Sequence, residues 1–341
     1  ISKISKISKI SKISKISKSK KYKKCKVCKQ KLVGTKKKRT ASKQCRCECN
    51  VSGAGASYIA GTGPKSEMPV WAQKGIACVD SAFFPQCAPV RQFSSVQKVG
   101  SGTFGAVFRA EATTGGVVAI KRYTQSAGDM KDGMPSDMIL EVGILRECHH
   151  PNVIRPLGIF AHEESSRGAD DGVWSWFLAM EAMECNLKEH CRLRGGTLES
   201  EAAHWVLSDA SRGLAYLHSM NIVHLDIKPQ NLLVSASGCL KIADFGISSV
   251  MRPGKVGPSE KCTISYRPAE LLLGETEYSG KVDVWSLGCV FCEVLTGQMT
   301  FEFAGTSDWS EWETLLCMFR HCGTPSEATW PGVSALPGFN A

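Results

Sequence analysis

The stretch His224-Leu-Asp-Ile-Lys-Pro-Gln-Asn231 decides how this chain is organised, together with Asp244-Phe-Gly246 a little further on. It places a carboxylate, a lysine and an amide in a loop between two short apolar runs, Ile222-Val223 and residues 232–234. These groups suit phosphoryl transfer, because one carboxylate can receive a hydroxyl proton while Asn231 and a second carboxylate hold Mg²⁺ against phosphates. The combined spacing is far more specific than any single acid in the chain.

A glycine-rich segment upstream supplies a second phosphate-binding signal. Residues 93–99 have the composition of a strand and lead into Gly100-Ser-Gly102-Thr-Phe-Gly105-Ala-Val107, and a second strand-like run follows at residues 107–110. Strands on both sides of the glycines favour a flap over ATP phosphates rather than a dinucleotide-binding turn. Val118-Ala-Ile-Lys121 then ends an apolar strand with a cation, which is well placed to bind phosphate oxygens.

Three helices are predicted around these motifs. Residues 135–147 form a short helix with Glu141 near the edge of its apolar face, so Glu141 is the candidate ion-pair partner of Lys121; a surface acid on an amphipathic helix is the alternative. Residues 200–220 show a helical apolar stripe, and residues 282–295 are apolar nearly all round, which is typical of a buried helix. Asp283 at its start is interpreted as a structural anchor, since a buried acid must be hydrogen-bonded.

Composition and charge frame the rest of the chain. A chain of 341 residues has room for roughly two domains, and no apolar run reaches the length of a membrane span. Of the 42 basic residues, 18 lie in residues 1–43, which contain no acid, and this leaves 24 basic residues against 32 acidic ones. The 16 cysteines, without a secretory signal, favour mostly reduced thiols in the nucleus or cytoplasm.

The N-terminal part is expected to be unstructured. Residues 1–43 form a basic low-complexity tail that opens with six Ile-Ser-Lys repeats, and we expect it to be disordered. Its lysine patches could serve as a nuclear address, or bind nucleic acid weakly. Cysteines between residues 25 and 49 could hold zinc, although their spacing favours unpaired thiols. Residues 44–91, rich in Gly, Ala, Ser and Pro, are expected to be a linker.

Together these motifs resemble the eukaryotic protein kinases over about residues 92–341, and they are most similar to the cyclin-dependent kinase family. The helix at residues 135–147 resembles that family's cyclin-binding helix, and residues 235–246 are similar to its cell-cycle-related kinase branch. The resemblance implies an α+β fold of two lobes, an N-lobe at residues 92–182 and a C-lobe at residues 183–341. Because the family fold continues through further helices, it also implies a C-lobe that is truncated at its C-terminal end.

The resemblance implies a role for each matching residue. Asp226 corresponds to the catalytic base and Lys228 to a γ-phosphate ligand, while Asn231 and Asp244 correspond to Mg²⁺ ligands. Residues that would contact ATP, or hold those that do, are Gly100, Gly102, Gly105, Val107, Ala119, Lys121, Glu141, Met180, Glu181, Met183 and Leu233. ATP and Mg²⁺ are therefore the expected cofactors, and a protein substrate and a cyclin-like activator at residues 135–147 are the expected partners.

Substrate choice and regulation are implied by the same likeness. Lys228 and Thr263 are typical of Ser/Thr kinases, and the family likeness implies an acceptor that precedes proline. Three arginines grip an activation-segment phosphothreonine in the family, but this chain has Leu225, Leu140 and Ser249 at those positions. Since a phosphate orders a loop only by meeting cations, we expect the usual phosphothreonine switch to be absent.

Two readings of function remain open from the sequence. The main one is an active, cell-cycle-type Ser/Thr kinase, because all the principal chemical groups are present. The alternative is a catalytically impaired, kinase-like scaffold, which Leu225 and the missing helices favour. Arg267-Pro-Ala-Glu270 inverts the family's Ala-Pro-Glu, and Glu270 is expected to anchor the segment.

Overall fold

The computed structural model describes residues 68–79, 90–102, 105–113, 115–123, 133–164, 173–251, 262–301 and 310–339. The basic tail at residues 1–43 and its cysteines lie outside the described residues, as does most of the predicted linker. No helix in the described ranges is long and apolar enough to cross a membrane. Nine of the described cysteines form no disulfide, whereas Cys78 is disulfide-bonded.

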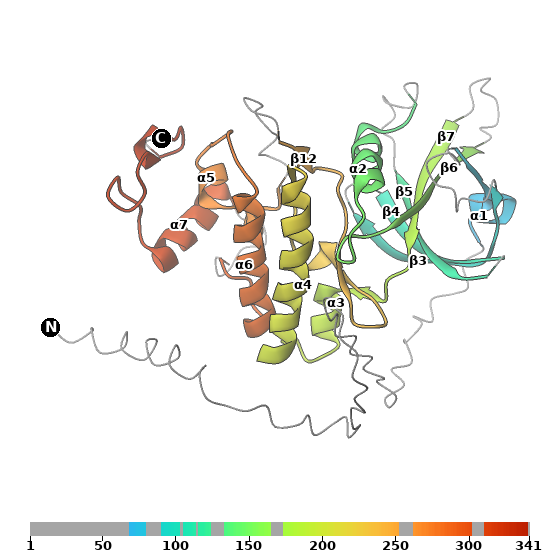
Figure 1. The fold of residues 1–341 in the computed structure, drawn as a ribbon, viewed down its shortest axis with the longest axis horizontal. Helices are drawn as coiled ribbons and strands as arrows, with labels where there is room; N and C mark the ends of the chain where they lie inside the picture. Colours follow the sequence, from blue (N-terminus) through green and yellow to red (C-terminus); the bar gives the residue numbers. More distant parts are fainter. Residues whose placement is uncertain are drawn as a thin grey trace, which may run out of the picture. The chain divides into compact units, whose positions relative to one another are not determined.

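A seven-stranded antiparallel sheet and two helices, α1 (Val70–Lys74) and α2, form the N-lobe (Figure 1). The strands are β1 (Ile76–Cys78), β2 (Val90–Arg91), β3 (Phe93–Gly102), β4 (Gly105–Ala112), β5 (Val117–Tyr123), β6 (Pro156–Glu164) and β7 (Val173–Glu181), in the order β2-β1-β6-β7-β5-β4-β3. Helix α2 (Ser136–Glu147) was predicted over residues 135–147 and buries Met138, Glu141 and Val142 among others. This arrangement brings the glycine-rich hairpin, Lys121 and Glu141 into one lobe.

Part of the predicted linker is folded. Residues 68–79 form α1 (Val70–Lys74) and β1, and β1 extends the sheet by pairing with β6. A helix of five residues is unstable by itself, so tertiary packing must hold it. Trp71 supplies that packing: its ring lies 5.2 Å from that of Phe108 and 4.9 Å from that of Phe177, between ring centroids. The expectation of a linker over residues 44–91 therefore fails for residues 68–79 and 90–91.

The C-lobe is mainly helical (Figure 1). Its helices are α3 (Leu187–Arg192), α4 (Ser200–Ser219), α5 (Ala269–Leu272), α6 (Lys281–Thr296) and α7 (Glu311–Cys322), with 3₁₀ turns at Pro229–Asn231, Ile264–Tyr266 and Val333–Ala335. Its short strands are β8 (Cys185–Asn186), β9 (Ile222–Val223), β10 (Leu232–Val234), β11 (Leu240–Ile242) and β12 (Ser249–Val250). The predicted helices at residues 200–220 and 282–295 correspond to α4 and α6.

Close packing in the C-lobe fixes where the loops between these strands lie. Helix α4 approaches β11 so closely that a Cβ atom on Gly213 would lie 2.8 Å from Cδ1 of Ile242 and 2.9 Å from the carbonyl oxygen of Asn152. Glycine is therefore required at this point of contact. The same continuous apolar core reaches from Trp71 in the N-lobe to Met318 in α7. The loop from β9 to β10, which carries Asp226, is thus supported by rigid elements.

Candidate active site

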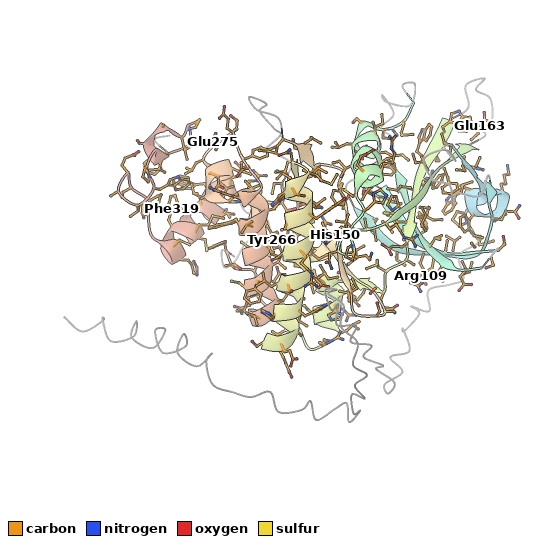
Figure 2. The ribbon with its side chains drawn as sticks, viewed as in Figure 1. Arg109, His150, Glu163, Tyr266, Glu275 and Phe319 are labelled. Atoms are coloured by element: carbon orange, nitrogen blue, oxygen red, sulfur yellow. The ribbon has the colours of Figure 1, made fainter. Side chains whose placement is uncertain are left out.

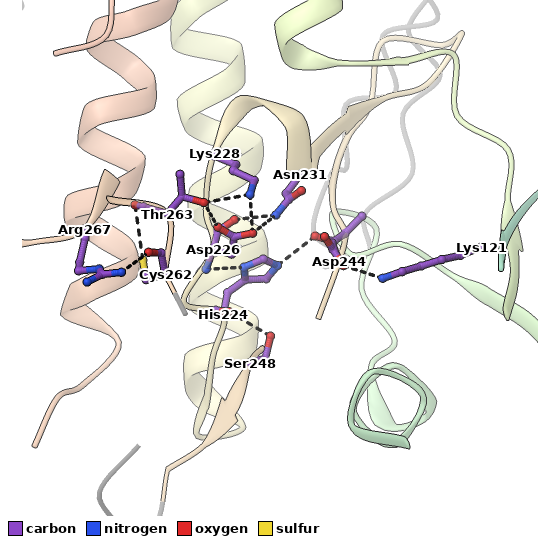
Figure 3. Close-up of polar contacts among 11 residues, drawn as sticks. Lys121, His224, Asp226, Lys228, Asn231, Asp244, Ser248, Cys262, Thr263 and Arg267 are labelled. Carbon is purple, nitrogen blue, oxygen red and sulfur yellow. Dashed lines mark hydrogen bonds and ion pairs between the residues drawn. The ribbon is translucent and has the colours of Figure 1, made fainter. Parts of the chain in front are cut away.

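Asp226 lies at the centre of a group of polar side chains in the loop after β9 (Figure 3). Its Oδ1 accepts a hydrogen bond from the Thr263 hydroxyl at 2.6 Å, and its Oδ2 lies 2.8 Å from Nζ of Lys228. Asn231 donates its Nδ2 both to Oδ2 and to the backbone oxygen of Asp226, at 2.8 and 2.9 Å. Burial opposes ionisation of Asp226, but Lys228 and the Thr263 hydroxyl outweigh it and lower the pKa of this carboxyl below its ordinary value. The group is therefore an ionised proton acceptor.

Asp283 and His224 hold this loop in place. Asp283 is fully buried at the start of α6, and it accepts the backbone N–H of His224 at 2.9 Å and a His218 ring nitrogen at 2.8 Å. The His224 ring contacts the backbone at both of its nitrogens, at Asp226 N (3.2 Å) and Ala243 O (3.0 Å). The interpretation of Asp283 as a structural anchor agrees with this geometry, since each of these hydrogen bonds goes to the framework of the site.

Lys121 lies between two carboxylates. Its Nζ lies 2.6 Å from Oε2 of Glu141 on α2 and 2.6 Å from Oδ1 of Asp244. Burial would lower the pKa of Lys121, but the two carboxylates outweigh burial and raise it, so the amine stays charged. Glu141 also accepts the backbone N–H of Phe245 at 3.3 Å, which connects α2 to the D-F-G stretch. The predicted Lys121–Glu141 ion pair is present.

The glycine-rich segment is a hairpin of two strands, as predicted. Gly100 on β3 pairs with Val107 on β4, and Gly102 pairs with Gly105. Gly105 has a φ of 138°, and a Cβ atom there would lie 1.9 Å from the carbonyl oxygen of Arg122. Only glycine fits this position, because a side chain would collide with the backbone of β5.

The residues expected around adenine come from neighbouring strands and from the connection between the lobes. On the sheet, Val107 pairs with Lys121, and Ala119 pairs with the buried Met180. Glu181 ends β7, the oxygen of Met183 accepts a hydrogen bond from Arg109, and Leu233 is half-buried on β10. Val107 and Ala119 thus lie on strands at or beside Lys121, whereas Leu233 lies on β10, two residues after Asn231.

These residues fit a nucleotide with a divalent metal. Carboxylate and amide oxygens are the ligands that Mg²⁺ prefers, and Asp244 and Asn231 offer both kinds. Both hydrogen bonds that the Asn231 side chain makes to described residues use its amide nitrogen, which leaves the amide oxygen for a metal. No cluster of three or more His, Cys, Asp or Glu residues in the described ranges could hold a metal alone. A metal here would therefore take its remaining ligands from phosphate and water.

The segment after residue 262 differs from what the sequence led us to expect. Glu270 has no ion-pair partner among the described residues, and burial raises its pKa. Arg267, which is 3% exposed, instead pairs with Glu311 at the start of α7. It also donates to the carbonyl oxygen of Cys262 at 2.5 Å (Figure 3). Arg267 therefore makes the contacts that hold this segment in the described part of the chain, and the role of Glu270 stays a prediction.

Sequence reasoning missed one side chain that contacts the site. The Tyr123 hydroxyl donates to Oε2 of Glu141 at 2.5 Å. Strand alternation was the available signal, since Tyr123 is two residues beyond Lys121 and therefore lies on the same face of β5.

Comparison with known proteins defines the class. Residues 93–336 match the family model of the protein kinase domain, and the chain belongs to this family. The predicted α+β, two-lobed kinase fold is thereby confirmed. Membership of this family supports a phosphotransferase and implies the use of ATP and a divalent metal. A solved structure, the yeast RNA Pol II CTD kinase CTDK-1 complex, contains a similar chain at 28% identity and a TM-score of 0.59. The match covers 69% of this chain and 71% of that chain.

Proposed function

We propose that this chain is an active, Mg²⁺-dependent Ser/Thr protein kinase of the cyclin-dependent type. The observation that carries this is the convergence of Asp226, Lys228 and Thr263, in which an ionised acceptor lies beside a cation. The motif resemblance to cyclin-dependent kinases and the likeness to a CTD kinase support the finer assignment. The likeness to CTDK-1 carries over only the class of substrate, a protein.

The residues divide the chemistry among them. When bound, ATP and its metal supply the γ-phosphoryl group and neutralise its charge. Asp226 accepts the proton of the substrate hydroxyl as the new P–O bond forms and the bond to the leaving oxygen of ADP breaks. Lys228 stabilises the charge that develops on the transferred group, and Lys121, held by Glu141, orients the other phosphates. Asn231 and Asp244 would hold the metal.

Labelled ATP tests the activity. We expect the wild-type chain to phosphorylate a protein substrate, and Asp226→Asn and Lys121→Met to lose at least about 100-fold of that activity. Equal incorporation by all three proteins would leave only the alternative, a kinase-like scaffold.

Proline specificity is supported by the Arg267 contact. Because the Cys262 carbonyl already accepts from Arg267 at 2.5 Å, it is a poorer acceptor for an N–H of a bound peptide. Cys262 adjoins Thr263, which contacts Asp226, so this carbonyl lies where the residue after the acceptor would bind. Proline has no N–H to leave unsatisfied there. We expect a Ser-Pro peptide to be preferred over a matched Ser-Ala peptide, and Arg267→Met to reduce that preference.

The positions that would grip an activation-segment phosphate are apolar or neutral. Leu225 is 2% exposed and packs with Val223, Ile247, Leu271 and Val282, while Leu140 and Ser249 are half-buried. A phosphate would meet no cation from these three positions. We expect phosphatase treatment to leave activity unchanged, and loss of activity traced to Ser259 or Thr263 would contradict this.

The proposed function also includes a cyclin-like activator that binds at α2. Ile139 is 56% exposed on the outer face of α2, and the next residue on that face, Gly143, carries no side chain that would obstruct a partner. An exposed apolar residue beside a smooth surface suits a partner helix. We expect a cyclin-box protein to raise activity and Ile139→Asp to prevent the increase, with the basal rate unchanged.

A further inference from the structure

Tyr123 contacts both members of the Lys121–Glu141 pair. Its hydroxyl donates to Oε2 of Glu141 at 2.5 Å, the same oxygen that lies 2.6 Å from Nζ of Lys121. The Lys121 Nζ also lies 5.0 Å from the centroid of the Tyr123 ring, a distance at which a cation and an aromatic face attract. Tyr123 is 3% exposed and Glu141 is fully buried, so water does not weaken these contacts.

A buried carboxylate is stable only when donors surround it. Among the described residues, Glu141 has three donors, namely Lys121, the backbone N–H of Phe245 and the Tyr123 hydroxyl. Lys121 is shared with Asp244 at the same 2.6 Å distance, and it is also the residue that must reach phosphates. The Tyr123 hydroxyl belongs to Glu141 alone among these side-chain donors. Burial and the Glu141 charge both raise the pKa of Tyr123, so the hydroxyl remains a donor at every physiological pH.

The geometry points to Tyr123 as a positioning residue that holds Glu141, and through it α2 and Lys121, in the arrangement that binds nucleotide, before any partner contacts α2. This rests on the kinase activity proposed above. With this role, two side chains on one face of β5 act together: Lys121 contacts the phosphates, and Tyr123 holds the acid that orients Lys121. The outer face of α2 plays no part in this contact, so an activator would add to an arrangement already formed.

The test is Tyr123→Phe in the full-length chain, which removes the hydroxyl and keeps the ring. A hydrogen bond to a buried charge is worth about 1.5–3 kcal/mol, which corresponds to roughly tenfold or more. We expect the α2 amides at residues 138–145 to exchange about tenfold faster with deuterium in nucleotide-free protein. We also expect the Kd for Mg²⁺–ATP, measured by titration calorimetry, to rise about tenfold, with KM for ATP rising more than kcat falls.

Tyr266→Phe is the matched control. The Tyr266 hydroxyl also donates to a carboxylate, Oε2 of Glu293 on α6, at 2.6 Å. Tyr266 lies in the C-lobe, away from α2 (Figure 2). We expect this variant to lower Tm to a similar degree and to leave α2 exchange and ATP affinity as in the wild type. Equal effects of the two variants on α2 exchange would overturn the positioning role.

A double variant distinguishes the loss of this contact from a general loss of stability. In a Glu141→Gln background, adding Tyr123→Phe should have little further effect on ATP affinity, because the contact is already disrupted. Fully additive effects would overturn the inference, as would wild-type α2 exchange and ATP affinity in Tyr123→Phe. If no protein phosphorylates a substrate but ATP affinity and α2 exchange still change as expected, the proposed function fails and the role of Tyr123 stands.

Discussion

The backbone N–H of Leu225 donates to Oδ1 of Asp283 at 2.9 Å. Leu225 has a φ of 68°, in the left-handed region that residues with a side chain rarely adopt, so its conformation needs support. Asp283 gives that support from α6, and with it fixes the residue before Asp226. The proposed proton acceptor, Asp226, is thus positioned by a carboxylate to which the proposed function assigns no chemical step.

Removing this support is expected to be costly. Asp283→Ala leaves the N–H groups of His224 and Leu225 buried without an acceptor, at about 1–3 kcal/mol each. Asp283→Asn keeps one acceptor oxygen and should lose roughly half as much. Urea unfolding measures both. Equal stability of the Ala variant and the wild type would show that the loop does not depend on this anchor.

Position 225 is not expected to tolerate arginine in place of leucine. Leu225→Arg would bury a cation in an apolar cluster without a partner, and should cost more than about 3 kcal/mol. Leu225→Met conserves the volume and should cost less than about 1.5 kcal/mol. Thermal melts of the two variants provide the comparison. An arginine variant as stable as the methionine variant would mean that packing does not select leucine here.

The pH dependence of activity follows from the lowered pKa of Asp226. The ionised carboxylate is the proton-accepting form, so activity falls only as pH drops through this lowered pKa, below the ordinary range of an aspartate. Lys228→Met removes the main group that lowers the pKa and leaves burial to raise it, so the acidic limb of kcat/KM should move to higher pH. The exposed Lys188→Met is the control and should leave the limb in place. An unmoved limb in Lys228→Met would contradict the role of this ion pair.

Metal removal should abolish activity and leave the fold intact. Asp244 pairs with Lys121 at 2.6 Å without a metal, so a chelator is expected to stop phosphorylation with little change in Tm. Added Mg²⁺ should restore the rate. Asp244→Asn should lose activity by at least about 100-fold and should not recover at higher Mg²⁺. Recovery of that variant would remove Asp244 from the metal site.

The catalytic motifs could be predicted from the sequence because their residues serve one reaction and occur at a fixed spacing. Asp226, Asn231 and Asp244 lie within a single short stretch of chain. The helix that carries Glu141 has an apolar face, and the helix that carries Asp283 is apolar nearly all round. The pairing of Lys121 with Glu141 followed from knowing that a buried cation needs an acid. Sequence patterns within short stretches of chain were enough to predict these features.

Other features depend on contacts between distant segments, and local patterns do not report these. The Arg267–Glu311 pair joins residues far apart in sequence, and nothing near Arg267 signals it. Tyr123 resembles an ordinary strand residue until its hydroxyl is seen against Glu141. Helix α1 is too short to show a period, and only its packing against the sheet explains it.

Trp71 shows that the family match and the folded unit begin at different places in the chain. Likeness to the kinase family begins at residue 93, yet the tryptophan that covers Phe93, Phe108 and Phe177 lies well before it. A fragment cut where the likeness begins would expose three aromatic rings to water and would be prone to aggregate. In this chain, the segment that matches the family is therefore shorter than the segment that packs together as one folded unit.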